Sequence, residues 1–231
     1  MKTTGGSDDQ KRRAAERAAD LVSAGETVGL GTGSTAAFAV RALGRKLESG
    51  ELDGVRGVAT SFASRQLARD SEIPLLDLDE VETIDIAIDG ADRVDSDGNL
   101  IKGGGAAHAR EKVVDAAADR FVVVADPSKV AETLDRAVPL EVLPAARTLV
   151  SGRVADLGGD PVLRTAERKD GPVVTDNGNL VLDCDFGAVE DPESLADDLS
   201  ATPGVVEHGL FVGLADEAYV GTEDGVDVRT Y

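Results

Sequence analysis

The chain has 231 residues, 42% of them hydrophobic, so it can bury a substantial core as one large domain or as a main domain with a smaller one. Its 44 acidic and 24 basic residues give a formal net charge of −20, which argues by simple electrostatics against nucleic acid and anionic membranes as partners. With lysine scarce and aromatics at 3%, the composition resembles that of proteins adapted to high salt, where screening relieves repulsion between carboxylates.

The sequence also argues against an oxidising compartment and a membrane. Its one cysteine, Cys184, cannot form an internal disulfide, and its place in an apolar alternation predicts a core position and not a nucleophile. Residues 1–17 are charged, unlike a signal sequence, and no apolar run is long enough to span a bilayer. We therefore expect a cytoplasmic protein with no membrane role.

The first half of the chain alternates helical and strand patterns. Ser7 and Asp8 are typical caps for a first helix that runs to about Val22. The patterns that follow predict a strand over 27–30, a helix over 36–47, a strand over 55–60, a helix over 62–71, a strand over 84–88, a helix over 106–118 and a strand over 121–124. This alternation predicts an α/β fold, with a Rossmann-like, mostly parallel sheet and helices on both faces.

The pattern changes after Lys129. We expect a strand over 138–142, a helix over 145–157, strands near Val162 and over 180–184, a helix over 194–199 and a strand over 205–211. Asn177-Gly178 is typical of a hairpin turn. The order resembles a ferredoxin-like split βαβ arrangement, which predicts a small α+β domain over 130–211. The strand-like stretch 218–228 returns to the first domain, which takes 1–129 and 212–231.

The sequence Asp89-Gly90-Ala91-Asp92 follows the isoleucine-rich strand over 84–88 and so lies where open α/β sheets bind ligands. Taken alone, it is more typical of a turn, because Asp and Gly form turns for local reasons. Lys102-Gly103-Gly104-Gly105 follows ten residues after Asp92, and Glu111 would lie in the second turn of the next helix. The glycines let the backbone approach a ligand, and the helix aims free N–H groups at it. The conjunction predicts an active site with acid, base and oxyanion-binding groups.

The distribution of lysine supports this prediction. The chain has 7 lysines against 17 arginines, yet Lys102, Lys112 and Lys129 lie within 28 residues of each other. A compact ammonium is therefore expected to be needed at one or more of these positions. A solvated helix charge is the alternative for Lys112.

Another glycine-rich turn, Gly31-Thr32-Gly33-Ser34-Thr35, joins a predicted strand to a predicted helix and offers a phosphate backbone N–H groups, hydroxyls and a helix N-terminus. It lacks the lysine of a P-loop, and Ser34 stands where a dinucleotide pattern needs its third glycine, so NAD is not expected. The alternative is a tight turn in which Ser34 or Thr35 only caps the helix.

Metal and cofactor chemistry is not expected. His108 and His208 are the only histidines, and no cluster of Cys, His or carboxylate side chains has metal-ligand spacing. We expect a structural or peripheral role for His108.

Together these sequences resemble ribose-5-phosphate isomerase type A nearly end to end. The match comprises Gly29-Leu30-Gly31-Thr32-Gly33-Ser34-Thr35, Asp89-Gly90-Ala91-Asp92, Lys102-Gly103-Gly104-Gly105-Ala106-Ala107, Arg110-Glu111-Lys112, Ala125-Asp126-Pro127-Ser128-Lys129 and Val173-Val174-Thr175-Asp176-Asn177-Gly178-Asn179. Ser61-Phe62-Ala63-Ser64 matches the family's serine-rich loop only loosely.

The resemblance implies an isomerase of the non-oxidative pentose phosphate pathway that interconverts ribose 5-phosphate and ribulose 5-phosphate through a cis-enediolate, without metal or cofactor. It implies that Glu111 is the general base, that Lys102 stabilises the enediolate oxygen, and that Asp89 assists ring opening. The implied substrate-binding residues are Lys11, Thr32, Gly33, Ser34, Thr35, Asp89, Gly90, Ala91, Asp92, Lys102, Gly103, Gly104, Gly105 and Lys129. The family's habit implies a homodimer or homotetramer.

Two other classes of protein stay open at this point. A non-catalytic sugar-phosphate sensor would need a DNA-binding module, whereas the N-terminus offers one short helix and a net charge of the wrong sign. An acyl or CoA transferase of similar fold would use Glu111 as a nucleophile, and a covalent thioester would identify it.

Overall fold

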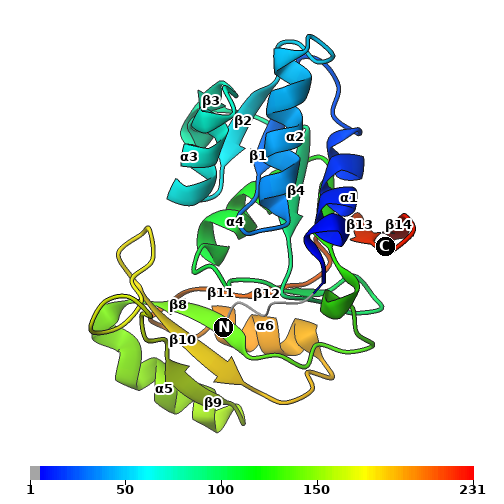
Figure 1. Ribbon diagram of the computed structural model, residues 1–231. Coiled ribbons are helices and arrows are strands. Elements are labelled where there is room, and N and C mark those ends of the chain that lie inside the picture. Colours follow the sequence, from blue (N-terminus) through cyan, green and yellow to red (C-terminus); the bar gives the residue numbers. More distant parts are fainter. Residues whose placement is uncertain (1–5) are drawn as a thin grey trace.

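A seven-stranded sheet forms the centre of the computed structural model, which describes residues 6–231 (Figure 1). Its order is β14-β13-β7-β4-β1-β2-β3, and every neighbouring pair is parallel except β13 and β14. The strands are β1 (Thr27–Leu30), β2 (Arg56–Ala59), β3 (Leu75–Leu76), β4 (Ile86–Gly90), β7 (Phe121–Ala125), β13 (Glu217–Gly221) and β14 (Val226–Thr230). This mostly parallel sheet confirms the predicted Rossmann-like class.

The two faces of the sheet are covered differently, as β7 shows. Val122 and Val124 pack in one apolar cluster with residues of α1 (Asp8–Ala19), α2 (Ala36–Glu48) and α3 (Phe62–Asp70). Phe121 and Val123 point the other way, because side chains alternate along a strand. They pack against a three-stranded sheet of β5 (Arg93–Val94), β6 (Leu100–Ile101) and β12 (Leu210–Phe211).

α4 (His108–Ala116) lies on the second face, where Val114 packs with Val58 and Ile84 in a separate small cluster. The helix starts two residues later than predicted. Ala106, just before it, has a φ of 60°, which a helix cannot contain. Helices therefore lie on both faces, as predicted.

Four of the remaining strands form a small antiparallel sheet of order β11-β8-β10-β9, which Figure 1 shows beside the seven-stranded sheet. In chain order these strands and the helices between them are β8 (Val138–Val142), α5 (Arg147–Asp156), β9 (Asp160–Leu163), β10 (Leu180–Asp185), α6 (Pro192–Ser200) and β11 (Val205–His208). Three 3₁₀ helices, η1 (Leu78–Glu80), η2 (Pro127–Lys129) and η3 (Pro144–Ala146), lie in connections. The βαββαβ order and this sheet confirm the ferredoxin-like arrangement. The domain boundaries at 129/130 and 211/212 stay a prediction.

The predicted strand over 205–211 is wrong, because Gly209 divides it between two sheets. β11 pairs with β8, whereas β12 pairs with β6. Gly209 accepts a hydrogen bond from the N–H of Lys102 and donates one to the carbonyl of Pro139. A Cβ at this position would lie 2.3 Å from the carbonyl oxygen of Lys102, so the crossing point requires glycine.

The C-terminal pattern and the first helix also differ in extent from the predictions. The stretch predicted as strand-like over 218–228 is a hairpin, in which β13 pairs with β7 and returns the chain to the first sheet as expected. α1 carries the predicted cap at Ser7 but ends at Ala19, before Val22. Across the part of the chain that the structure describes, no helix has the length and apolar character needed to cross a membrane.

The acidic composition leads to a prediction about salt. Carboxylates such as Asp8 and Asp9 are strongly exposed, and a net charge of −20 makes the folded surface repel itself until counterions screen it. The melting temperature should therefore rise clearly between low and molar KCl, as measured by calorimetry. A melting temperature that stays flat or falls with KCl concentration would contradict adaptation to high salt. It would not bear on the fold or on the candidate site.

Candidate active site

The candidate site lies where β1 and β4 end side by side, at the point where the strand order of the central sheet reverses. β4 ends in Asp89 and Gly90. The carboxylate of Asp89 is fully buried, and its Oδ1 accepts the N–H groups of Thr32 at 2.9 Å and of Gly90 at 2.6 Å. A Cβ on Gly31 would lie 2.1 Å from Oδ1, so the turn after β1 can approach this carboxylate only because residue 31 is glycine.

Lys102 is buried at the centre of the site, with 2% of its side chain exposed. Its Nζ lies 2.9 Å from Oδ2 of Asp89 and donates to the carbonyl of Gly90 at 2.5 Å. The same ammonium is 3.7 Å from Oε2 of Glu111 and 3.6 Å from Oδ2 of Asp115. Burial alone would lower the pKa of Lys102, but the three carboxylates outweigh it and raise the pKa above its ordinary value. The lysine therefore stays charged.

Glu111 stands in the first turn of α4, not the second as predicted, because the helix begins at His108. Only 6% of its side chain is exposed. Burial raises the pKa of Glu111 well above the ordinary value of 4.5, Lys102 opposes this, and the carboxylates of Asp89 and Asp115 add to it. A carboxylate with a raised pKa is a stronger base, which suits the abstraction of a proton from carbon.

The glycine loop between Lys102 and α4 is held from two sides. The N–H of Gly104 donates to Oδ2 of Asp92 at 2.7 Å. Gly103, with a φ of 105°, has its carbonyl turned to Nη1 of Arg164 at 2.8 Å. Arg164 follows β9 of the small sheet and also pairs with Asp183, so the second sheet fixes the loop of the first.

Hydroxyls gather at the end of β1. Oγ1 of Thr32 lies 2.8 Å from Oγ1 of Thr60 and 2.7 Å from Oγ of Ser61. Gly33 and Ser34 follow in an exposed turn, and Thr35 precedes α2 without making a side-chain cap. The alternative of Thr35 as an ordinary cap is therefore wrong. The first turn of α2 carries no acidic residue, which leaves this helix N-terminus suited to an anion.

Lys129 lies at the end of η2 and is largely buried. Burial lowers its pKa, Asp92 opposes this, and the positive charges of Arg136 and Lys11 lower it further. Arg136, Lys11 and Asp92 therefore all lie near enough to Lys129 to act on its charge. Such a group fits a ligand with more than one negative charge.

Three charged side chains near the candidate site were not found by sequence reasoning. Asp115 could have been found, because it stands four residues after Glu111 and so shares its helix face. No sequence pattern around Arg136 or Arg164 indicates a place near the site, since the tertiary fold alone brings both residues there.

Other sequence predictions concern residues around the site. His108 is buried, and its Nε2 accepts the N–H of Glu141 at 3.1 Å. Burial lowers the pKa of His108 to about 3, which agrees with a neutral, structural histidine. Cys184 is buried in the core, as predicted, and burial raises its pKa to about 12. Lys112 is not a solvated charge: its Nζ contacts Oε1 of Glu207 at 2.6 Å. Among residues 6–231 no group of His, Cys, Asp or Glu side chains could hold a metal ion.

Asn177 lies in a turn, as predicted, and this turn also contacts α3 and α4, which pack on the seven-stranded sheet. Oδ2 of Asp176 accepts the N–H of Phe62, at the start of α3, at 2.7 Å. Oδ1 of Asn177 accepts Nε of Arg110, on α4, at 2.9 Å. The carboxylate of Glu141 accepts hydrogen bonds from the side chains of Thr175, Asn177 and Asn179 and so stabilises the turn.

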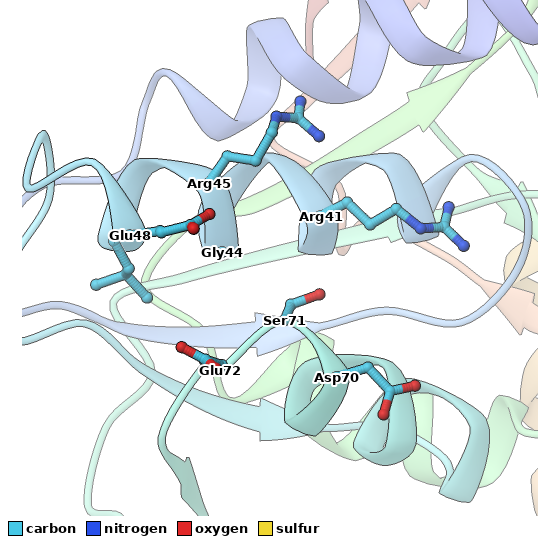
Figure 2. Close-up of a pocket in the computed structure, with 8 residues that line it drawn as sticks. Arg41, Gly44, Arg45, Glu48, Asp70, Ser71 and Glu72 are labelled. Carbon is cyan, nitrogen blue, oxygen red and sulfur yellow. The ribbon is translucent and has the colours of Figure 1, made fainter.

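A surface pocket of about 550 Å³ lies between α2 and α3 (Figure 2). Figure 2 shows Arg41 and Arg45 on α2 and Asp70 and Ser71 at the end of α3, with the side chain of Arg45 directed away from α3. None of the predicted site residues lines this pocket. It is separate from the cluster around Lys102.

Comparisons with known proteins match the whole chain. A family model described as ribose 5-phosphate isomerase A (phosphoriboisomerase A) matches residues 56–225. Ribose-5-phosphate isomerase A of Haloarcula marismortui is 68% identical over 226 residues, covering 98% of this chain and 97% of the relative. The enzyme of that name from Natronomonas pharaonis is 66% identical over 229 residues, covering 99% and 100%.

Solved structures agree. Ribose 5-phosphate isomerase A of Methanocaldococcus jannaschii superimposes with a TM-score of 0.94 at 43% identity, covering 98% of this chain and 100% of that one. A D-ribose-5-phosphate isomerase in complex with phospho-erythronic acid gives a TM-score of 0.96 at 39% identity, with the same coverage.

Proposed function

The chain belongs to the ribose 5-phosphate isomerase A family, and from this premise we infer that it is an aldose-ketose isomerase interconverting D-ribose 5-phosphate and D-ribulose 5-phosphate. The observation that carries the mechanism is the buried contact of Lys102 with both Asp89 and Glu111. It joins a carboxylate base to a charged donor, as proton transfer next to a carbonyl requires.

The proposed reaction passes through a cis-enediolate. In the open-chain aldose, the Glu111 carboxylate takes the proton from C2, and the electron pair of that C–H bond moves into a C1–C2 double bond while O1 becomes anionic. The Lys102 ammonium and the N–H groups of the glycine loop stabilise that oxygen. Glu111 then returns the proton to C1, and a proton moves from O2 to O1, so atoms and electrons balance without an oxidant. Asp89 assists ring opening and holds sugar hydroxyls, with Asp92 beside it.

The phosphate is proposed to bind between the turn after β1 and the cations. Thr32, Gly33, Ser34 and Thr35 offer hydroxyls, backbone N–H groups and the N-terminus of α2. Lys11 and Lys129 supply the charge. The lowering of the Lys129 pKa, to which Arg136 and Lys11 contribute, supports this, because a bound dianion relieves that repulsion.

The sensor and transferase alternatives are less well supported. The relatives that match end to end are named as isomerases, and a solved relative of nearly equal fold is in complex with phospho-erythronic acid. A sensor has no need of three buried carboxylates around one ammonium, an arrangement that is costly to bury.

The wider setting is proposed from the family and from the composition. We place the enzyme in the non-oxidative pentose phosphate pathway, in the cytoplasm, as a homodimer or homotetramer. A net charge of −20 and a relative 68% identical from Haloarcula marismortui support adaptation to high salt.

Solvent exchange tests the reaction. Ribose 5-phosphate incubated with the enzyme in D₂O, without added metal, should gain deuterium at C1 of the ribulose 5-phosphate formed, because Glu111 exchanges its proton with solvent before returning it. Mass spectrometry and proton NMR of the product measure this. Isomerisation with complete retention of the substrate hydrogen would indicate a hydride shift and contradict the enediolate.

A further inference from the structure

Asp115 lies one helical turn after Glu111 on α4 and faces the same ammonium. Its Oδ2 is 3.6 Å from Nζ of Lys102, and 1% of its side chain is exposed. Neither of its carboxylate oxygens has a hydrogen-bond partner among residues 6–231. Buried polar atoms in proteins are nearly always paired, so this carboxyl group requires an explanation.

The charges around Lys102 do not balance if every group is ionised. Asp89, Glu111 and Asp115 would give three negative charges against one positive charge, all shielded from water. Like charges at short range in a medium of low dielectric do not all ionise, and the group with the least support keeps its proton.

The hydrogen bonds identify that group. Asp89 accepts two backbone N–H groups and lies 2.9 Å from the ammonium, which favours its ionised form. Glu111 must be ionised to act as the base. Asp115 accepts no backbone N–H and lies 3.6 Å from the ammonium, farther than Asp89, and burial raises its pKa well above the ordinary 3.8 while Lys102 opposes this. The phenyl rings of Phe121 and Phe211 also lie near the ammonium, with their centroids 5.8 and 5.3 Å from Nζ, and the ammonium of Lys112 lies 5.0 Å from the centroid of Phe211.

We propose that Asp115 serves the isomerase site as a neutral acid, keeping its proton at neutral pH so that Lys102 balances Asp89 and Glu111 alone. An ionised Asp115 would place a further negative charge beside the ammonium that must stabilise the enediolate oxygen. Asp115 is thus a positioning residue, which acts through Lys102. This proposal rests on the proposed function, which requires Glu111 to be the ionised base and Asp115 to act through Lys102.

Infrared spectroscopy in D₂O at neutral pH reads the proton directly. The wild-type enzyme should show the carbonyl band of a protonated carboxylic acid, and Asp115→Asn should lose it. Asp119→Asn, which changes an exposed carboxylate four residues further on, should keep it. A band that persists in Asp115→Asn would assign the proton to Asp89 or Glu111 and overturn the proposal, as would a wild-type spectrum without the band.

Urea unfolding gives a second measurement that does not depend on activity. A carboxyl group whose folded-state pKa is raised costs no stability below its unfolded pKa, and the cost grows as the pH rises toward the folded value. Asp115→Asn should therefore gain stability over wild type as the pH rises from about 4 to 7, whereas Asp119→Asn should show little trend. A loss of stability over that range would mean that Asp115 is ionised and paired.

Kinetics test the effect on the reaction. Asp115→Ala should lower kcat by about 10-fold with a smaller change in KM, because the ammonium loses one of its positioning contacts, and Asp115→Asn should recover most of that loss. Equal kcat values in Asp115→Ala and wild type would remove the positioning role. If wild type itself does not interconvert the two sugar phosphates, the proposed function fails, while the spectroscopic result still decides the state of Asp115.

Discussion

Replacing Glu111 with glutamine should lower kcat by about 100-fold or more while the substrate still binds, because the change keeps the shape of the side chain and removes the base. Steady-state kinetics and a direct measurement of binding on the folded variant check both parts. Glu48→Gln, at an exposed position on α2, is the matched control and should behave as wild type. Near-normal turnover in Glu111→Gln would remove the assignment.

The pH dependence of kcat/KM should report the same group. Glu111 acts in its ionised form, so activity is lost as the pH falls through its folded-state pKa. Because burial raises that pKa well above 4.5, the acid limb should have its midpoint well above 4.5. A midpoint at or below the ordinary value would mean that another group is the base.

Replacing Lys102 with methionine should lower kcat by about 100-fold or more, with a smaller effect on substrate affinity, because its charge is aimed at an oxygen that becomes anionic only as the proton leaves. The variant loses a cation that contacts Asp89, Glu111 and Asp115 together, so its fold must be verified by circular dichroism.

Lys129→Met is the contrasting variant. In the proposed site Lys129 binds the phosphate throughout the reaction, so the loss of its charge should chiefly raise KM and leave kcat less affected. If Lys102→Met changes only affinity, Lys102 is a substrate clamp, and the N–H groups of the glycine loop alone must stabilise the enediolate.

Local patterns predicted some of the buried strands to the residue. Strand β1, over 27–30, and strand β8, over 138–142, have the predicted bounds, because both are several residues long, mostly apolar and buried along their whole length. The two-residue strands β3, β5 and β6 were not predicted, since pairs of residues carry no periodicity and pair only through the tertiary fold.

The same limit applies to the site. Asp89, Lys102 and Glu111 come from one stretch of chain, so their nearness could be inferred from the end of a strand and the start of a helix. Arg164 reaches the loop at Gly103 from a different sheet, and nothing in the sequence around it distinguishes it from a surface arginine. Gly209 was predicted as part of a strand. The contact that requires glycine there is with Lys102, which is distant in the sequence and so leaves no local pattern.

The contacts of the small sheet with the glycine loop and with α3 and α4 have a consequence for how the molecule melts. Arg164 bonds the carbonyl of Gly103, and Asp176 and Asn177 accept donors from Phe62 and Arg110. If the small sheet unfolded by itself, Gly103, Phe62 and Arg110 would lose these hydrogen bonds together, and the glycine loop would lose its contact with Arg164. The two sheets are thereby joined into one cooperative unit around the site, and the geometry of the reacting groups lasts only as long as both sheets stay folded.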